Sequence, residues 1–571
     1  MGHFEYEYAA DFETTPDPED CRVWAFAICN LDDIEDVIYG GGIDEFMTCI
    51  EALAPCKLYF HNLAFDVTFI FDWLLRNGWE WIDARSPGAG QFTTLISDMN
   101  QVYSTEIGFD DASVLIWDSL KLIPMSVAAE AKAFGLPESK GELDYNLRRE
   151  PGHVMTEEEA DYIRRDVQID AAAIKIMHDN GLDRMTIGAC ALSGYRSIIG
   201  GGRRFRKAFP LLTPEEDEFI RKSYRGGWVY ANPKYAGVEV GAGISYDVNS
   251  LYPSVMASCD GELLPYGKPV PFTGEPKPDE LYTLWVARLR MVFHVKHRHL
   301  PCIQLKGNLS FLPTEYIEDS GDEQTVTITS VDWDLIRRQY DVRVVEWMGG
   351  YYFKGSRTLF RGYVGQWIEE KNQATIDKNP GRRQIAKLML NSLYGKFATQ
   401  IRGVSRKPIL DESDILRYVD LDPEERDGVY LPVGSFITAW ARRKTVMAAQ
   451  ALGDRFLYSD TDSVKVLGEE RPRMKVDDVR LGWWKDEGHF LRFKAIRAKT
   501  YMAEYPDPRY GEEGHDEPTK LEIHVAGMPK RCHKYVTFDN FQVGARYPGK
   551  LYRRMVPGGV ILYEGDFEIR G

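Results

Sequence analysis

The alternation of hydrophobic and polar positions gives the first third of the chain an α/β character. Up to about residue 185, short runs of β-branched and aromatic residues alternate with longer amphipathic runs. We predict strands at 5–12, 22–29 and 57–60, and helices at 67–75 and 156–177. Thr156 followed by Glu159 is a capping-box sequence, which marks the start of the second helix.

The remaining two thirds of the chain form a larger, mixed region beyond a polar, glycine-rich connection near residues 200–204. The pattern predicts a strand that ends at Asp247, a helix at 384–396, and strands at 456–458 and 464–466. Residues 258–355 and 400–430 look like insertions. At 571 residues the chain exceeds a single core, so we expect an α/β and α+β multidomain fold.

Composition indicates a globular chain of 44% hydrophobic and 27% charged residues. No apolar run approaches the roughly 18 residues that would span a membrane, and the N-terminus lacks the features of a signal peptide. The eight cysteines show no CxxC spacing, which predicts neither zinc nor a disulfide framework. We therefore expect a reducing cytoplasm and no membrane partner.

The net charge of −17 argues against nucleic acid as a partner, but its distribution does not. Residues 371–407 hold nine Lys or Arg against one acid, and 492–501 hold four basic residues and no acid. Both stretches contain aromatic residues, as suits a surface that tracks phosphates and stacks bases. A solvated basic face is the alternative. Acidic residues concentrate at 411–427.

The turn between the two last predicted strands contains Asp460 and Asp462. Two carboxylates at such a tip repel one another unless a cation lies between them. Oxygen ligands of this kind suit Mg²⁺, which also takes substrate phosphates. An ordinary Asp-rich turn is the alternative interpretation.

A second set of residues could complete this metal site. Asp247 ends a strand, the carbonyl of Val248 offers another oxygen ligand, and Tyr252 could face a sugar. In the predicted helix, Lys387, Asn391 and Tyr394 share one face, where lysine suits a triphosphate and tyrosine can stack on a base. A packed core tyrosine and a solvated lysine are the alternatives.

The first region carries its own acidic set. Asp11 and Glu13 share one face of a strand, and Tyr162 and Asp166 share one face of a helix. Asp66 follows the sequence HNLAF at a helix start. Converging on two divalent ions, these groups could align a water and polarise a phosphodiester, with Tyr162 orienting the water. Unrelated surface acids are the alternative.

In order and spacing these motifs resemble those of a known family. DxxSLYPS from Asp247, KLMLNSLYGKF from Lys387 and YxDTDS from Tyr458 resemble motifs A, B and C of family B DNA polymerases. DFE, HNxxFD and YxxxD resemble the 3′–5′ proofreading exonuclease of the DnaQ-like class. The resemblance implies an RNase H-like exonuclease domain at 1–185 and a right-hand polymerase domain at 186–571.

The resemblance also implies roles for individual residues. The acids Asp11, Glu13, Asp66 and Asp166 would hold the exonuclease metals, and Asp247, Val248 and Asp462 the polymerase metals, with Asp460 in support. Nucleotide contacts would come from Val248, Tyr252, Lys371, Arg383, Lys387, Asn391 and Tyr394. DNA would contact Thr14, His61, Asn62, Phe65, Ser119, Leu120, Lys140, Tyr224, Arg225, Gly226, Gly227, Lys499 and Tyr501.

Two insertions point to the protein-primed subfamily. The resemblance then implies a palm at about 186–257, 356–360 and 431–525, fingers at 361–399, a thumb at 526–571, and terminal-protein regions at 258–355 and 400–430. It implies two Mg²⁺ per active site, replaceable by Mn²⁺, with DNA template and primer, dNTPs and a terminal protein as partners. The enzyme would be virus-encoded, act in the cytoplasm of an infected bacterium, and be a monomer or a heterodimer with the terminal protein.

Three other readings remain at this point. A family B polymerase primed by nucleic acid would lack the terminal protein. A DNA-binding scaffold would have inactive sites, and a nuclease-only enzyme would use only the first acidic set. Intact carboxylates at every matched position disfavour the inactive scaffold, and the nuclease-only enzyme is also disfavoured.

Overall fold

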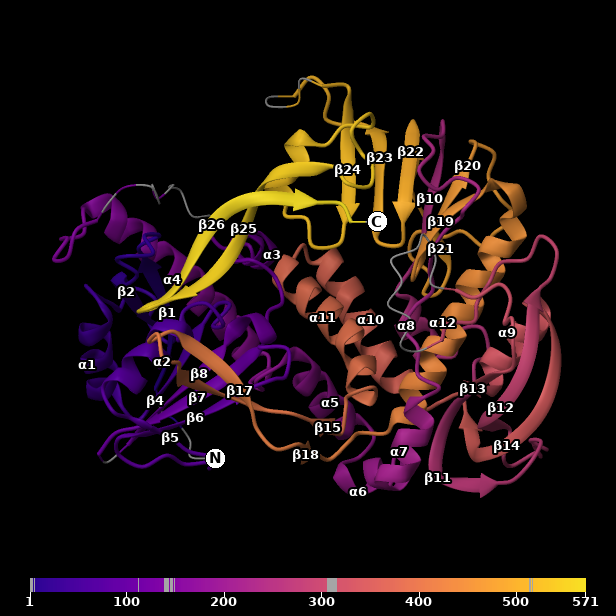
Figure 1. Ribbon diagram of the computed structural model, residues 1–571, viewed down its shortest axis with the longest axis horizontal. Coiled ribbons are helices and arrows are strands. Elements are labelled where there is room, and N and C mark those ends of the chain that lie inside the picture. Colours follow the sequence, from indigo (N-terminus) through magenta and orange to yellow (C-terminus); the bar gives the residue numbers. More distant parts are fainter. Residues whose placement is uncertain are drawn as a thin grey trace.

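The first region is built on a mixed eight-stranded sheet (Figure 1). The computed structural model describes residues 4, 6–110, 112–137, 143, 147, 149–305, 316–512, 515 and 517–570. The sheet has the order β3-β2-β1-β4-β8-β7-β6-β5 and contains β1 (Tyr6–Thr14), β2 (Val23–Asn30), β3 (Val37–Gly40), β4 (Cys56–Phe60), β5 (Glu80–Trp81), β6 (Gln91–Ile96), β7 (Val102–Gly108) and β8 (Ser113–Asp118). The central strands β1, β4 and β8 are parallel.

Helices cover both faces of this sheet. Ala10 and Phe12 of β1 pack with α1 (Ile43–Leu53) and α2 (Val67–Arg76). Ala9 lies on the other face, with α4 (Glu157–Asp179), while α3 (Val127–Phe134) packs beside α4. The predicted capping box of Thr156 and Glu159 opens α4. Because side chains alternate along a strand, Asp11 and Glu13 continue the face of Ala9, toward α4.

A five-stranded antiparallel sheet lies at the centre of the second region. Its order is β21-β10-β20-β19-β9, with β9 (Val229–Ala231), β10 (Gly243–Val248), β19 (Phe456–Asp460), β20 (Ser463–Leu467) and β21 (Trp484–Phe490). The long helix α12 (Leu431–Leu452) packs against it, and α8 (Leu251–Met256) follows β10. A neighbouring three-stranded sheet contains β22 (Arg492–Arg497), β23 (Thr500–Pro506) and β24 (Thr519–Val525).

Several helices connect these parts, and the start of one of them differs from the sequence prediction. They are α5 (Ile187–Ile198), α6 (Gly202–Ala208), α7 (Pro214–Arg221), α10 (Arg361–Ile376) and α11 (Pro380–Phe397), with short 3₁₀ turns η1 (Ser119–Lys121), η2 (Gly453–Arg455) and η3 (Lys530–Tyr535). The predicted connection at 200–204 is shorter than expected. Only Gly200 and Gly201 turn the chain, at φ 93° and 91°, whereas Arg203 and Arg204 belong to α6. Arginine is a good helix former, so the polar run continues as helix.

Both predicted insertions fold as β-structure. The described residues of the first insertion contain a sheet of order β11-β14-β12-β13, with β11 (Leu264–Phe272), β12 (Leu284–Val295), β13 (Gln324–Thr329), β14 (Tyr340–Ser356) and the helix α9 (Ser330–Gln339). Residues 400–430 form two small ribbons, β15 (Arg402–Gly403) with β18 (Glu424–Glu425) and β16 (Arg406–Leu410) with β17 (Leu416–Asp420). Four acidic residues of this insertion pair with its own arginines, as in Arg406–Asp420 and Arg417–Asp411.

Two ribbons distant in sequence pack onto the first region (Figure 1). One is β16–β17, whose Leu416 enters the core of the eight-stranded sheet. The other is the C-terminal hairpin of β25 (Arg546–Val556) and β26 (Gly559–Glu568), whose Val560 and Ile561 enter the same core. Within the described ranges, no helix is long and apolar enough to cross a membrane.

Replacing Gly559 by alanine should loosen the C-terminal hairpin. The backbone there has φ 150°, and an added Cβ would lie 2.5 Å from the Phe69 ring. Overpacking of this kind costs about 1–3 kcal/mol. We expect faster proteolytic cleavage of the hairpin in Gly559→Ala. Gly544→Ala is the matched control, because Gly544 has φ 84° but open space around it. Equal cleavage of both variants would assign the effect to backbone strain instead.

Candidate active sites

One cavity gathers the acidic residues of the first region. It encloses about 660 Å³, and its lining includes every predicted catalytic residue of that set: Asp11, Glu13, Asp66, Tyr162 and Asp166. β1 supplies the first two, Asp66 immediately precedes α2, and α4 supplies the last two. Thr14, His61, Asn62 and Phe65 line the same cavity. The convergence predicted for these residues is therefore present.

Neighbouring acids raise the pKa values of three of these carboxyl groups. Burial, and then the charge of Asp166, raises the pKa of Asp11 to about 7. Burial and the neighbouring acids also raise the pKa of Glu13 and of Asp66. Neighbouring carboxylates repel one another when all are ionised, and a bound cation relieves that repulsion. Their oxygen atoms therefore suit divalent metal ions.

Basic side chains at this cavity were not found from the sequence. Arg531 and Arg553 of the C-terminal segment line it, and the charge of Arg553 lowers the pKa of Asp66 against the larger effect of burial. Arg149 similarly opposes the raised pKa of Glu13 and bonds Glu159, with Nε to Oε1 at 2.8 Å. No local sequence signal places residues 149 or 553 beside strand β1, since only the folded packing does so.

Two predicted DNA contacts do not line this cavity, and a third lies outside the described residues. Ser119 is fully buried, and its hydroxyl donates to Asp170 at 3.0 Å. Leu120 lies beside it in η1, where its N–H donates to Asp118 at 3.1 Å. Lys140 falls outside the described residues. The DNA contacts of all three remain predictions.

A second group of carboxylates lies at the tip of the central sheet of the second region. Asp247 of β10 pairs in register with Ser463 of β20, and Asp460 pairs with the same residue from β19. The backbone N–H of Val248 donates to the Asp462 carbonyl at 2.8 Å. This pairing brings residues 247 and 462 together although they are far apart in the sequence.

Burial and repulsion by nearby carboxylates also raise the pKa values of Asp247 and Asp462. Burial, then Asp462 and Glu487, raises the pKa of Asp247 to about 7. Burial also raises the pKa of Asp462. Lys465, only 6% exposed, partly opposes the shift of Asp247, and its ammonium group bonds the Ser245 hydroxyl. A lysine in the apolar strand VKV was a signal in the sequence for such a buried charge.

Three cations predicted for a triphosphate are brought together on α10 and α11. Burial and the charges of Arg383 and Lys387 lower the pKa of Lys371. Lys485, which the sequence did not reveal, adds to this effect and stands opposite Asp247 in the β10–β21 register. Neighbouring Arg382 pairs instead with Glu370 at 2.7 Å, so not every arginine of the basic stretch is available.

Two predicted aromatic residues pack against each other with their rings tilted. The rings of Tyr252 and Tyr394 lie 4.1 Å apart, centroid to centroid, at an interplanar angle of 32°. The charge of Asp462 reaches both phenols. Asn391, on the same helix as Tyr394, is exposed.

The segment from Tyr224 to Gly227 lies against the acidic turn. A Cβ on Gly227 would meet the Thr461 side chain at 2.6–2.9 Å, and Thr461 N donates to the Trp228 carbonyl at 2.9 Å. Arg442 of α12 holds this segment by donating to the carbonyls of Arg225 at 2.8 Å and Gly226 at 2.9 Å. The Arg225 guanidinium bonds backbone carbonyls of the protein, including that of Gln304 at 3.1 Å. Its DNA contact remains a prediction.

Two further predicted residues border Asp460. The Lys499 ammonium group forms an ion pair with Asp460, and its backbone N–H donates to the Tyr458 hydroxyl at 2.9 Å. Tyr501 packs between Tyr458 and His524, with each ring centroid 4.7 Å away. Lys499 is thus placed at the carboxylates, while Tyr501 is mostly buried.

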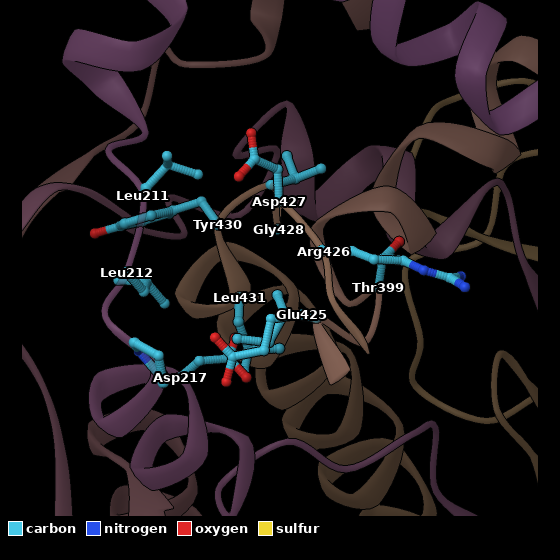
Figure 2. Close-up of a pocket in the computed structure, with 13 residues that line it drawn as sticks. Leu211, Leu212, Asp217, Thr399, Glu425, Arg426, Asp427, Gly428, Tyr430 and Leu431 are labelled. Carbon is cyan, nitrogen blue, oxygen red and sulfur yellow. The ribbon is translucent and has the colours of Figure 1, made fainter. Parts of the chain in front are cut away.

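A separate cavity contains no predicted site residue. It encloses about 170 Å³ near the end of the second insertion, and Figure 2 shows Leu211, Asp217, Glu425 and Tyr430 around it. The Asp217 carboxylate is already bound by Arg221 at 2.7 Å. Shape alone therefore does not locate the chemistry, which depends on the two carboxylate groups.

The chain belongs to a known family. Residues 53–150 and 142–479 match the family described as DNA polymerase type B, organellar and viral. The chain is accordingly a DNA-directed DNA polymerase with a multidomain α/β fold, and the family predicted from its motifs is confirmed.

Similar proteins come from bacteriophages. The DNA polymerase of Bacillus phage Nf is 40% identical over 99% of both chains. The structure of phi29 DNA polymerase complexed with primer-template DNA superimposes with a TM-score of 0.92 at 38% identity, covering 99% of this chain and 100% of that one. The complex of the same enzyme with primer-template DNA and incoming nucleotides has a TM-score of 0.91 at the same identity, with the same coverage.

Proposed function

We propose that this virus-encoded enzyme replicates a linear genome by protein-primed, strand-displacing DNA synthesis with 3′–5′ proofreading. The observation that carries the proposal is the presence of two separate carboxylate groups, of which only one lies beside triphosphate-binding cations. The cavity of Asp11 and Asp66 is the exonuclease site, and the tip bearing Asp247 and Asp462 is the polymerase site. The RNase H-like and right-hand architecture predicted above, with its domain limits, belongs to this proposal.

The residues of the polymerase site fit a two-metal reaction. Asp247, Asp462 and the Val248 carbonyl would hold two Mg²⁺, or Mn²⁺, which lower the pKa of the primer hydroxyl and neutralise the triphosphate. Lys371, Arg383 and Lys387 bind and orient the triphosphate through charge. Tyr252 and Tyr394, whose rings pack together, present an aromatic surface to the sugar and base. Lys499 orients the primer end from beside Asp460.

The residues of the exonuclease cavity also fit a two-metal reaction. Its four acids would hold a second pair of ions, while Tyr162 orients the attacking water. His61, Asn62 and Phe65 line the wall and would hold the unpaired 3′ end of the primer.

Primer extension on a primed single-stranded circle tests this function. With Mg²⁺ and dNTPs we expect products longer than one circle, which require both synthesis and displacement of the strand ahead. Products that stop at one circle length would contradict strand displacement. Priming is tested separately with labelled dATP and a candidate terminal protein. The absence of a covalent nucleotide–protein adduct would favour the nucleic-acid-primed alternative.

The raised pKa of Asp247 predicts a pH-dependent stability difference. Without metal, the folded carboxyl keeps its proton up to about pH 7, whereas the unfolded one loses it near 3.8. The wild type therefore loses stability as pH rises between these values. Asn cannot ionise, so metal-free Asp247→Asn should gain several degrees in Tm relative to wild type between pH 5 and pH 8. Mg²⁺ at pH 8 should narrow the gap. A constant difference across this range would contradict the shift.

A further inference from the structure

Beside the exonuclease cavity lies a cluster with two acids, Glu130 and Asp170, that the proposed function does not use. It consists of His61 after β4, Glu130 of α3 and Asp170 of α4, with Ser119 of η1 beside them. Potential ligand atoms of the first three lie within 4.8 Å of one another. The cluster thus joins three separate elements at one point.

Glu130 is the unusual member of the cluster. Its side chain is fully buried, and neither carboxylate oxygen has a hydrogen-bond partner. The imidazole Nδ1 of His61 lies 3.4 Å from Oε1, too far for a well-formed hydrogen bond. Leaving a buried carboxylate without donors costs several kcal/mol. The position therefore calls for a cationic partner.

The distances between the donor atoms match the spacing of metal ligands. His61 Nδ1 lies 3.7 Å from Asp170 Oδ1 and 3.1 Å from Ser119 Oγ, which itself lies 3.0 Å from Asp170 Oδ1. Ligands bonded at about 2.1 Å stand about 3.0 Å apart in octahedral and about 3.4 Å apart in tetrahedral geometry. The observed separations of 3.0–3.7 Å fall at this scale.

We propose that His61, Glu130 and Asp170 form a third cation-binding site, for a divalent transition-metal ion such as Mn²⁺ or Zn²⁺, with the Ser119 hydroxyl as an adjacent ligand. One imidazole nitrogen with carboxylate oxygens favours these ions over Mg²⁺, which prefers oxygen alone. The two carboxylates balance the charge of a divalent ion, and the neutral imidazole adds no charge. No charge then remains unpaired in this buried place.

The cation would position His61. Because His61 also lines the exonuclease cavity, metal coordination at Nδ1 fixes the ring orientation and leaves the proton on Nε2. The ion thus connects α3 and α4 to the wall of the cavity without contacting the reacting atoms. This role makes Glu130 and Asp170 positioning residues rather than catalytic ones.

Protons are the competing partner for these charges. Burial and the charge of Asp170 raise the pKa of Glu130 to about 9. Although burial opposes it, the hydrogen bond and charge of Asp170 raise the pKa of His61 to about 9 as well. A protonated Glu130 with a charged His61 would also balance Asp170. The experiment has to separate a bound metal from this arrangement.

Anomalous diffraction and metal content provide that separation. Metal-stripped full-length protein is equilibrated with Mn²⁺, the bound metal is counted, and anomalous difference maps of the same preparation locate it. We expect a peak between His61, Glu130 and Asp170, and the loss of one bound equivalent per chain in Glu130→Gln. Asp170→Asn should show the same loss. Glu262→Gln is the matched control, because Glu262 is a buried carboxyl, 5% exposed, outside the cluster.

Two results would overturn the proposal. The first is the absence of an anomalous peak at the cluster when the other sites are saturated. The second is an unchanged metal count in Glu130→Gln, the neutral analogue of the protonated side chain. If both single variants fail to fold, the apolar double variant Glu130→Leu/Asp170→Leu supplies the comparison, since it leaves no buried charge. The readout is bound metal rather than activity, so it is independent of whether the proposed proofreading function holds.

Discussion

Asp247→Asn should abolish primer extension and leave 3′–5′ digestion of single-stranded DNA intact. The substitution keeps the size of the side chain but removes one of the two acids that face each other at the sheet tip. Metal-assisted charge stabilisation is worth several kcal/mol in such reactions, so extension should fall by about 10³-fold or more. Extension and digestion are measured on the same preparation, with a 5′-labelled primer and with or without dNTPs.

Asp486→Asn is the matched control for this loss. Asp486 lies on the adjacent strand β21, opposite Tyr246, and is partly buried. Its carboxylate accepts a hydrogen bond from the Gly488 N–H at 3.0 Å rather than joining the acidic tip. We expect extension within a few fold of wild type. If Asp486→Asn were as defective as Asp247→Asn, general damage to the sheet would explain both.

The parts of the fold that could be predicted from the sequence depend on local chemistry. The Thr156 capping box fixes the start of α4 because the reciprocal hydrogen bonds join residues three apart. Alternation along β1 placed Asp11 and Glu13 on one face, and the structure shows both in one cavity. In the same way the turn after β19 brings Asp460 and Asp462 to a strand tip. Each of these follows from a period or a turn within a few residues.

The features that sequence reasoning missed depend on pairings over long separations. Lys485 stands opposite Asp247 only because β10 pairs with β21, and nothing in either strand specifies that register. Arg553 reaches the acidic cavity of the first region because the C-terminal hairpin packs onto that region. In the sequence, Glu130 and Asp170 look like ordinary helix residues, because only the packing of α3 against α4 brings them together. Amphipathic patterns identify which face is buried but not which element covers it.

The uneven distribution of charged residues explains how a chain with a negative net charge can bind DNA. Four acids of the second insertion pair with its arginines, whereas Lys371, Arg383 and Lys387 lie together, and none of the three forms an ion pair with a carboxylate among the described residues. Like charges held together raise the local potential for phosphate despite the overall charge of −17. Fewer basic residues are therefore available for phosphate than the number of Lys and Arg in the sequence suggests. The available ones include Lys371, Arg383 and Lys387 on α10 and α11.

Asp66→Asn should show the converse behaviour of Asp247→Asn, with digestion abolished and extension retained. Asp66 is 4% exposed, and its carboxyl group faces Asp11 and Glu13 at the cavity. Removing its charge eliminates a metal ligand of one site, while the sheet tip that holds Asp247 stays unchanged. We expect digestion to fall by about 10³-fold or more, and mismatched primers to be extended without prior trimming.

Asp72→Asn is the control on the same helix α2. Asp72 is equally buried, at 5% exposed, but its carboxylate binds Arg76 at 2.7 Å rather than facing the cavity. That variant should lose stability yet keep digestion per folded molecule. Loss of both activities in a folded Asp66→Asn protein would show that the two carboxylate groups do not act as independent sites.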